Sequence, residues 1–321
     1  MNTRLSNSIV VVGASAGGLE ALKALLDELP SDFECPICVV LHTSRRSDGT
    51  TGLPEVLSYA SKLSVKHPQD GERLKPRWIY VAEPDYHLVI RDGHMHLVKG
   101  PKENRARPSI DPLFRSAAES YGSSVVGILL SGASDDGTAG LWEIKNRGGV
   151  TIVQSPTEAL FPRMVNSALE NVAIDYTLPV NEIGRLGAIC KEKSGTERIP
   201  SEIAMDATTS QFICPECNGP IQLIRHGNLD EYRCRVGHSY SPQSFYEAHK
   251  DAEEHAIWAA IVLLETGADL ADKLSVSQPD LKKEATGKRQ LANTIRKMFV
   301  SSSGPKKLVE SDSDLVAGPS R

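Results

Sequence analysis

Three residues able to perform hydrolytic chemistry each follow a short apolar run in the first half of the chain. The runs and the residues after them are Ile9–Val12 with Ser15, Ile37–Leu41 with His42, and Val125–Ser131 with Asp136. A serine hydroxyl is too weakly acidic to attack an ester unless a histidine takes its proton and a carboxylate holds the imidazole in the right tautomer. Because the carboxyl ends of parallel strands meet at one edge of a sheet, we predict a Ser–His–Asp triad there.

The loop that carries Ser15 reads GASAGG over residues 13–18 and matches the pattern G-x-S-x-G. A serine on a tight turn between a strand and a helix is exposed at the carboxyl edge of the sheet, and small neighbours let a substrate carbonyl approach. Backbone N–H groups at the start of the following helix are oriented to stabilise an oxyanion. The loop therefore predicts a nucleophile elbow.

A phosphate-binding glycine loop is the competing interpretation of residues 13–18. The dinucleotide fingerprint requires glycine at position 15, where Ser15 stands, and a P-loop requires lysine near position 19. Neither condition is met. Taken singly, each triad candidate also has a structural explanation: an ordinary strand–helix turn, a loop histidine, and a turn-forming aspartate before Gly137. Their shared position after three separate apolar runs favours the catalytic interpretation.

A second group of residues has the spacing of a metal site. Cys214 and Cys217 form a CxxC pair, and Cys234 is followed four positions later by His238. Three thiolates and one imidazole suit a closed tetrahedral Zn²⁺ site with a structural role, although four incidental residues remain an alternative. We predict no cofactor for catalysis. The other pair, Cys35 and Cys38, lies beside an apolar run and is interpreted as packed core thiols.

The elements that position these residues alternate between short apolar runs and amphipathic stretches up to about residue 190. Candidate strands are Ile9–Val12, Pro36–Leu41, Trp78–Ala82, His87–Ile90, His94–Val98, Val125–Ser131 and Val150–Val153, and candidate helices are Leu19–Leu29 and Leu113–Tyr121. This order predicts an α/β fold with a doubly wound, mostly parallel sheet covered by helices on both faces. The runs His87–Ile90 and His94–Val98 predict a β-hairpin inserted into that pattern.

The remainder of the chain predicts smaller parts. We assign residues 1–190 to the catalytic domain, 191–210 to a polar linker, 211–248 to a zinc-ribbon-like module, 249–300 to a helical hairpin and 301–321 to a disordered tail. The apolar face of the hairpin is expected to pack within it, and a partner or dimer contact is the alternative. That face comprises Ile257, Ala260, Ile261 and Leu264.

The composition limits the function classes. The net charge is −5 and the sequence pI is about 6.0, whereas nucleic-acid-binding domains usually have a basic face and a high pI. We therefore expect no nucleic-acid partner. The apolar run at residues 9–12 is shorter than the core of a signal peptide, and residues 256–264 cover about half of a membrane span. We expect a cytoplasmic protein without a membrane span, and the sequence does not indicate its oligomeric state.

The first 190 residues resemble the catalytic domain of CheB, the chemotaxis protein-glutamate methylesterase. The matching segments are GASAGG at 13–18, VVLH at 39–42, LSGASDDG at 130–137, VAEPDYHL at 81–88 and RPSIDPLF at 107–114. The resemblance implies that Ser15 is the nucleophile, His42 the general base, and Asp136 rather than Asp135 the orienting acid. It also implies that the oxyanion is held by backbone N–H groups of Ala16 and Ala133.

The chain departs from the family pattern at several positions. Ala16 stands where relatives commonly have Thr, Ala133 where they usually have Met, and Thr43-Ser44 where they have Met-Pro. A backbone donor survives the change at Ala133, whereas the change at Ala16 is expected to alter hydrogen bonding in its loop. CheB proteins typically carry an N-terminal phospho-receiver domain, whereas this sequence begins at the catalytic strand and adds a C-terminal extension. We therefore do not expect regulation by that route within the chain.

The resemblance implies a function for these residues. The expected reaction is hydrolysis of glutamate methyl esters on a methylated chemoreceptor or similar signalling protein, with release of methanol, and glutamine deamidation is an additional reaction. The protein would act peripherally on membrane receptors. The alternative is a catalytically weak CheB-like regulatory or binding protein that recruits partners through its C-terminal module. A nucleotide-dependent α/β enzyme is disfavoured because the chain lacks a phosphate fingerprint.

Overall fold

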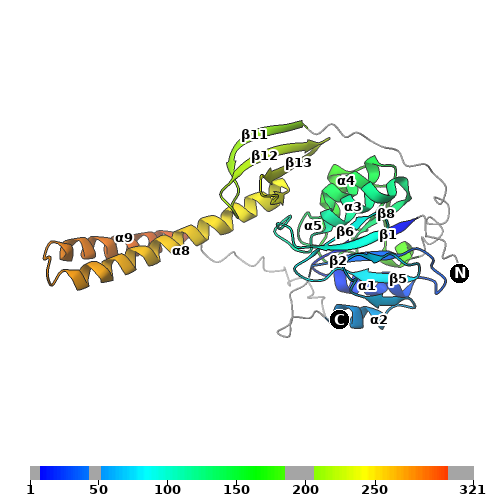
Figure 1. The fold of residues 1–321 in the computed structure, drawn as a ribbon, viewed down its shortest axis with the longest axis horizontal. Helices are drawn as coiled ribbons and strands as arrows, with labels where there is room; N and C mark the ends of the chain where they lie inside the picture. Colours follow the sequence, from blue (N-terminus) through cyan, green and yellow to red (C-terminus); the bar gives the residue numbers. More distant parts are fainter. Residues whose placement is uncertain (1–7, 43–51, 185–205, 303–321) are drawn as a thin grey trace, which may run out of the picture. The chain divides into compact units, whose positions relative to one another are not determined.

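The computed structural model describes residues 8–42, 52–184 and 206–302. The chain forms two compact units, Met1–His249 and Lys250–Arg321 (Figure 1). Two earlier assignments fall partly outside the described residues: most of the linker, at 191–205, and the tail from residue 303. Residues 43–51, which include the departures at Thr43 and Ser44, also lie outside them.

A seven-stranded sheet forms the centre of the first unit. Its strands are β1 (Ile9–Ala14), β2 (Ile37–Leu41), β3 (Ser64–Lys66), β5 (Trp78–Val81), β8 (Val125–Leu129), β9 (Val150–Gln154) and β10 (Tyr176–Leu178). They lie in the order β10-β9-β8-β1-β2-β5-β3, and every pairing between them is parallel. The predicted parallel α/β fold is confirmed.

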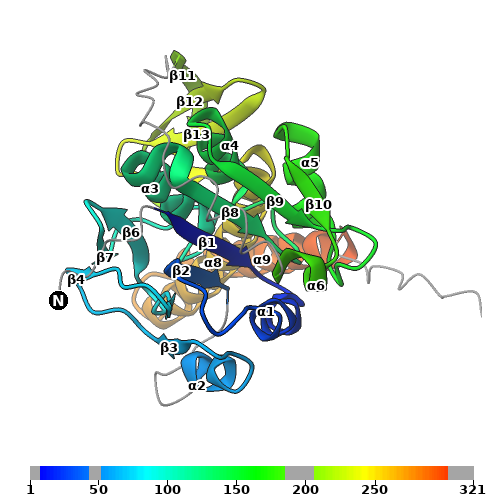
Figure 2. The same cartoon turned by 90° about the vertical axis from the view of Figure 1, so that its right-hand side faces the viewer.

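Helices cover both faces of this sheet (Figure 2). One face packs against α1 (Gly18–Asp27), α2 (Leu53–Ser58) and α6 (Val180–Ile183), and the other against α3 (Ile110–Tyr121), α4 (Thr138–Asn146) and α5 (Arg163–Asn171). Every residue of β1, β2 and β8 is buried, because strands covered on both faces need apolar side chains in either direction. The strands that follow β1 along the chain extend the sheet first on the β2 side and later on the β8 side, so the direction of strand order changes at β1.

A three-stranded antiparallel sheet contains the predicted hairpin. It consists of β4 (Glu72–Arg73), β6 (His87–Arg91) and β7 (His94–Val98) in the order β4-β7-β6. Arg91 pairs with His94, so the turn residues are Asp92 and Gly93, with φ of 48° and 75°. Positive φ at both central residues matches the right-handed twist of the two strands.

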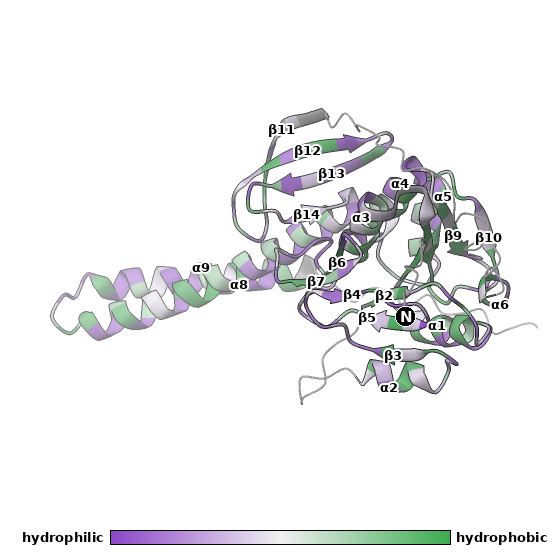
Figure 3. Cartoon of the chain, turned by 45° about the vertical axis from the view of Figure 1, so that its right-hand side comes forward, coloured by the Kyte–Doolittle hydropathy of each residue, from purple (hydrophilic) through white to green (hydrophobic). Residues whose placement is uncertain are grey.

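The cysteine-containing module is a four-stranded antiparallel sheet followed by a helix. Its strands are β11 (Asp206–Ile213), β12 (Pro220–His226), β13 (Leu229–Cys234) and β14 (Ser239–Tyr240). Figure 3 shows hydrophilic and hydrophobic residues mixed along β12 and β13, in keeping with one buried face. Phe245 packs against this sheet, with its ring stacked 4.7 Å from that of Tyr232.

Two elements extend across the boundaries predicted for the module. Strand β11 begins at Asp206, inside the segment assigned to the linker, because its bonds to β12 stabilise a polar sequence that shows no periodicity alone. Helix α8 (Pro242–Leu274) begins inside the segment assigned to the module. Its partner α9 (Leu281–Ser302) ends two residues beyond the predicted hairpin.

The second unit contains the hairpin formed by α9 and by α8 from Lys250 onward. Its buried side chains are small: Ala268, Ala271, Ala285 and Ala292, together with Ile261. Ala260, which we assigned to the packed face, is exposed, because the buried positions Ile261 and Ala268 lie two helical turns apart on a face that does not include it. Among the described residues, no helix has both the length and the apolar character needed to cross a membrane.

Candidate active site

The three candidate triad residues follow neighbouring strands of the sheet. Strand β1 lies between β8 and β2, and all three run parallel, so their carboxyl ends share one edge. Ser15 donates its backbone N–H to the carbonyl of Ser131 (3.0 Å), and the N–H of His42 donates to the carbonyl of Ala14 (3.1 Å). The ladder therefore continues past the strands and fixes the backbone of Ser15 beside that of His42.

Glycines permit the close packing around Ser15. Gly17 has φ of 69°, and a Cβ there would lie 2.9 Å from the hydroxyl of Ser131. A Cβ on Gly132 would lie 3.0 Å from Cβ of Ser15 and 1.9 Å from Cε of Met164. A larger residue at position 132 would push the third loop of the site, residues 130–137 after β8, away from Ser15. Gly132 therefore sets the distance between this loop and Ser15.

His42 and Asp136 meet at the same edge. Nε2 of His42 lies 3.0 Å from Oδ2 of Asp136, and the two side chains are 19% and 0% exposed. Nε2 of His42 has no described hydrogen-bond partner in a suitable geometry, so its contact with Asp136 is close but not aligned. Catalytic contacts of this kind often align only when substrate is bound. The separation suits a carboxylate that orients the ring and stabilises imidazolium.

The carboxylate of Asp136 is held by the start of helix α3. It accepts hydrogen bonds from the N–H of Ile110 (2.6 Å), the N–H of Asp111 (3.3 Å) and the hydroxyl of Ser109 (2.8 Å). These N–H groups have no partner within the helix, and the positive end of the helix dipole favours an anion there. Burial acts to raise the pKa of Asp136, but the contact with His42 and the hydrogen bond from the N–H of Ile110 lower it to about 2.

Two further acidic residues lie next to Asp136 and differ from it. Burial and the charge of Asp136 raise the pKa of Asp111 well above its ordinary value. Burial likewise raises the pKa of Asp135, whose carboxylate accepts a hydrogen bond from Ser241 (2.5 Å). Asp136 is thus the carboxylate of the three whose pKa is lowered, and it is the one beside His42.

Sequence reasoning gave no role to the residues that hold Asp136. Ser109 and Asp111 belong to a segment quoted for the family resemblance, and Ser109 precedes the first residue of α3, a position where serine is favoured. That preference could have pointed to Ser109. Asn104, which donates from Nδ2 to Asp136 (2.9 Å), lies in an irregular loop and carried no signal.

Of the two predicted oxyanion donors, Ala16 follows Ser15 in the same loop and Ala133 lies in the loop between β8 and α4. Ala16 is partly buried and Ala133 is exposed. Neither backbone N–H has a hydrogen-bond partner among the described residues. Such free N–H groups at a loop next to the nucleophile suit the developing charge of a tetrahedral intermediate, and the assignment of both residues stays a prediction.

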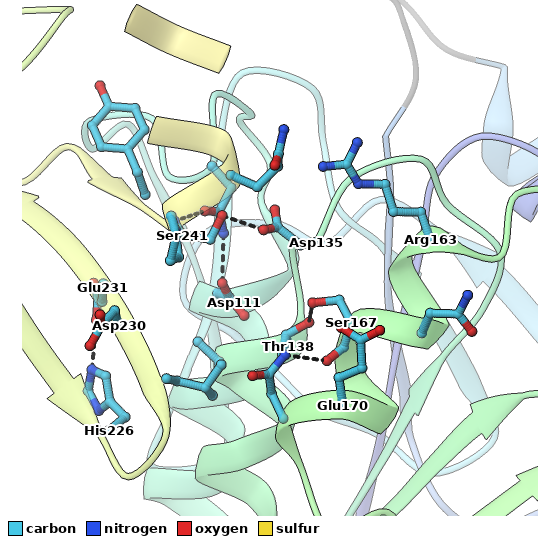
Figure 4. Close-up of a pocket in the computed structure, with 18 of the residues that line it drawn as sticks. Asp111, Asp135, Thr138, Arg163, Ser167, Glu170, His226, Asp230, Glu231 and Ser241 are labelled. Atoms are coloured by element: carbon cyan, nitrogen blue, oxygen red, sulfur yellow. Dashed lines mark hydrogen bonds and ion pairs between the residues drawn. The ribbon is translucent and has the colours of Figure 1, made fainter. Parts of the chain in front are cut away.

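A cavity of about 830 Å³ opens beside the third loop (Figure 4). Its lining includes Ala133 and Asp135 from that loop, Arg163 from α5, and Asp230 and Ser241 from the module. Ser15 and His42 are not among its lining residues. The cavity therefore adjoins the candidate triad through Ala133 and does not contain it.

The predicted metal ligands come together in the module. The ligand atoms of Cys214, Cys217, Cys234 and His238 all lie within 4.8 Å of one another. Sγ of Cys217 is 3.6 Å from Sγ of Cys234, and Nδ1 of His238 is 3.4 Å from that sulfur and 3.7 Å from Sγ of Cys214. Tetrahedral Zn²⁺ requires S–S and S–N separations of about 3.8 and about 3.6 Å, so the cluster fits this ion.

The family model for CheB methylesterase matches residues 10–186, which is more than half of the chain. The chain belongs to the CheB methylesterase family. The match begins in β1 and ends just after α6, so it contains Ser15, His42 and Asp136. The cysteine module and the helical hairpin lie outside it.

Relatives agree with this assignment over the same region. A protein of Leptospira interrogans, provisionally named protein-glutamate methylesterase/protein-glutamine glutaminase, is 39% identical over 178 residues, which are 55% of this chain and 91% of the relative. A protein of Anaeromyxobacter dehalogenans with the same activity in its name is 42% identical over 55% of this chain and 51% of its own length. The crystal structure of the Thermotoga maritima CheB methylesterase catalytic domain matches with a TM-score of 0.54 and 35% identity, covering 57% of this chain and 98% of that one.

Proposed function

We propose that this CheB-family protein hydrolyses glutamate methyl esters on chemoreceptor-type proteins and releases methanol. The observation that supports it most is the 3.0 Å separation of His42 from a fully buried Asp136, at the sheet edge where Ser15 begins the neighbouring loop. The names of the relatives support the same substrate class. Deamidation of receptor glutamines follows the same chemistry, with ammonia in place of methanol as the leaving group.

Each candidate residue has one task in this reaction. The hydroxyl of Ser15 attacks the ester carbonyl while His42 accepts its proton, and because Nε2 faces Asp136, Nδ1 is the nitrogen that remains for this transfer. The N–H groups of Ala16 and Ala133 stabilise the oxyanion. His42 then protonates the departing methoxide to give methanol. A water molecule, deprotonated by His42, hydrolyses the acyl-enzyme and leaves a free glutamate.

The test is methanol release from a methylated receptor by the Ser15→Ala variant. We expect the rate to fall by a factor on the order of 10⁴ or more, because the residues of a triad act as a unit. Ser58→Ala, on helix α2, is the matched control and should retain the wild-type rate. Near-normal methanol release by Ser15→Ala would refute the assignment.

We also propose that Cys214, Cys217, Cys234 and His238 hold one structural Zn²⁺. Their separations support a tetrahedral ion, and four protein ligands leave no position for a catalytic water. The ion would stabilise a module whose own hydrophobic core is small. No step of ester hydrolysis passes through this site.

A further inference from the structure

Asn104 contacts the candidate catalytic acid through its amide nitrogen. Nδ2 donates one hydrogen to Oδ1 of Asp136 (2.9 Å) and the other to Oδ2 of Asp111 (2.7 Å). One amide group therefore spans two buried carboxylates, and its position affects where the carboxylate of Asp136 lies relative to His42.

The other side of the same residue is held by the cysteine module. Oδ1 of Asn104 accepts hydrogen bonds from the N–H of Ser241 (2.9 Å) and from the hydroxyl of Ser244 (3.0 Å). The backbone N–H of Asn104 donates to the carbonyl of Ser239 (2.8 Å). Both hydrogens and both acceptor directions of the amide are used, which fixes its orientation.

The local backbone does not hold Asn104 in place by itself. Asn104 and Arg105 have φ of 49° and 66°, a conformation that residues other than glycine adopt rarely. They form the tip of a turn closed by a bridge between Glu103 and Ala106, outside any helix or strand. Contacts from elsewhere in the fold must therefore fix this turn.

The contacting serines follow directly after the metal cluster. Strand β14 (Ser239–Tyr240) begins at the residue after His238, and Ser241 accepts the N–H of Ser244 (3.0 Å) at the start of α8. This is the geometry of a helix N-cap, which holds Ser241 and Ser244 in fixed positions relative to each other. Folding of the module thus determines where the contacts to Asn104 stand.

We propose that the cysteine module positions the catalytic acid: Ser241 and Ser244 hold the amide of Asn104, and Asn104 holds Asp136 against His42. Asn104 is a positioning residue and does not touch the reacting atoms. The inference rests on the proposed function, because it assumes that Asp136 serves the triad. It makes the module a part of the active-site support and gives the C-terminal extension a role in turnover.

Simple docking of the module is the competing explanation. Glu247 of α8 forms ion pairs with Arg105 (2.9 Å) and Arg163 (3.6 Å), which attach the module without touching Asp136. If docking alone mattered, loss of one serine hydroxyl would lower stability and leave turnover of the folded protein unchanged. A double-mutant cycle separates the two explanations.

The experiment uses the full chain with Asn104→Ala, Ser244→Ala and the double variant. We expect Asn104→Ala to lower kcat for methanol release by a factor of ten to one hundred, roughly what one hydrogen bond to a charged group provides, with KM unchanged. Ser244→Ala should lower kcat about threefold. The double variant should match Asn104→Ala, since Ser244 acts through Asn104. Gln243→Ala, which changes the same helical turn without contacting Asn104, is the control.

A second readout separates failure of this inference from failure of the proposed function. A small fluorophosphonate labels an activated serine: the Ser15 oxygen bonds to phosphorus, its proton passes to His42 and fluoride leaves. Labelling rates should follow the same order as kcat, even if the receptor is not the substrate. Equal labelling of wild type and Asn104→Ala, or a further loss of rate in the double variant, would overturn the inference. Labelling without methanol release would refute only the proposed substrate, and absence of both would refute both proposals.

Discussion

Asp135 and Asp136 are neighbours in the chain and have opposite surroundings. Asp136 is fully buried, lies 3.0 Å from His42 and has a pKa lowered to about 2 by His42 and by donors at the start of α3, against the effect of burial. Asp135 faces the cavity and binds Ser241, and burial raises its pKa. A carboxylate that orients a histidine must stay ionised during turnover, and only the surroundings of Asp136 favour that state.

The two aspartates therefore predict unequal effects of the same substitution. Asp136→Asn removes the charge that stabilises imidazolium and places an amide beside His42 that favours the wrong tautomer, so kcat should fall by about 10⁴. Asp135→Asn still accepts the hydrogen bond from Ser241 and should change kcat by about twofold or less. Methanol-release kinetics of both variants provide the measurement, and the larger loss in Asp135→Asn would contradict the assignment.

At the level of elements, continuous apolar runs predicted the strands whose side chains are buried on both faces of the sheet. Strands β1, β2 and β8 were predictable because their residues are apolar without interruption, and β6 and β7 because of the turn between them. Strands β3, β4 and β10 were missed, since they are two or three residues long and contain no buried side chain. Their partners in the sheet stabilise them, which local sequence does not reveal.

The candidate site likewise has a part that the sequence predicts and a part that it does not. The positions of Ser15, His42 and Asp136 after three strands could be predicted, because parallel topology brings strand ends together. Asn104 could not, since its role depends on contacts with Ser241 and Asp136, which are distant in the chain and belong to different parts of the fold. The cysteine spacing predicted the ligand cluster but not its connection to that loop.

For the cysteine module we predict one bound metal ion that is lost when a ligand is replaced. We expect about one Zn²⁺ per chain by elemental analysis of the wild-type protein, and none in Cys234→Ser. Protease cleavage between residues 206 and 249 should become faster in that variant, because the module has a small core without the ion. Cys35→Ala, a buried thiol of the catalytic domain, should keep its zinc. A wild-type chain without bound metal would disprove the site.

On the scale of the whole molecule, buried carboxylates link stability to pH. Burial acts to raise the pKa of Glu231 in the module, but contacts with His226 (2.8 Å) and Arg233 (2.5 Å) lower it to about 2, as for Asp136. A lowered folded-state pKa contributes stability above the unfolded-state pKa, and this is lost as the pH falls through the folded value. The raised pKa of Asp111 acts in the opposite sense, since its contribution is lost as the pH rises.

The acid limb of the stability profile should therefore depend on Glu231. Between pH 7 and pH 3 its protonation should lower the free energy of unfolding by about 2 kcal/mol, given an unfolded pKa near 4.5 and a folded pKa of about 2. Glu231→Gln cannot lose this contribution, so its unfolding free energy should fall by about 2 kcal/mol less than that of the wild type over the same range. Urea unfolding at the two pH values measures the difference. Glu119→Gln, an exposed carboxylate on α3, should follow the wild type. Equal losses in the wild type and Glu231→Gln would mean that the contacts of Glu231 do not lower its pKa in the folded protein.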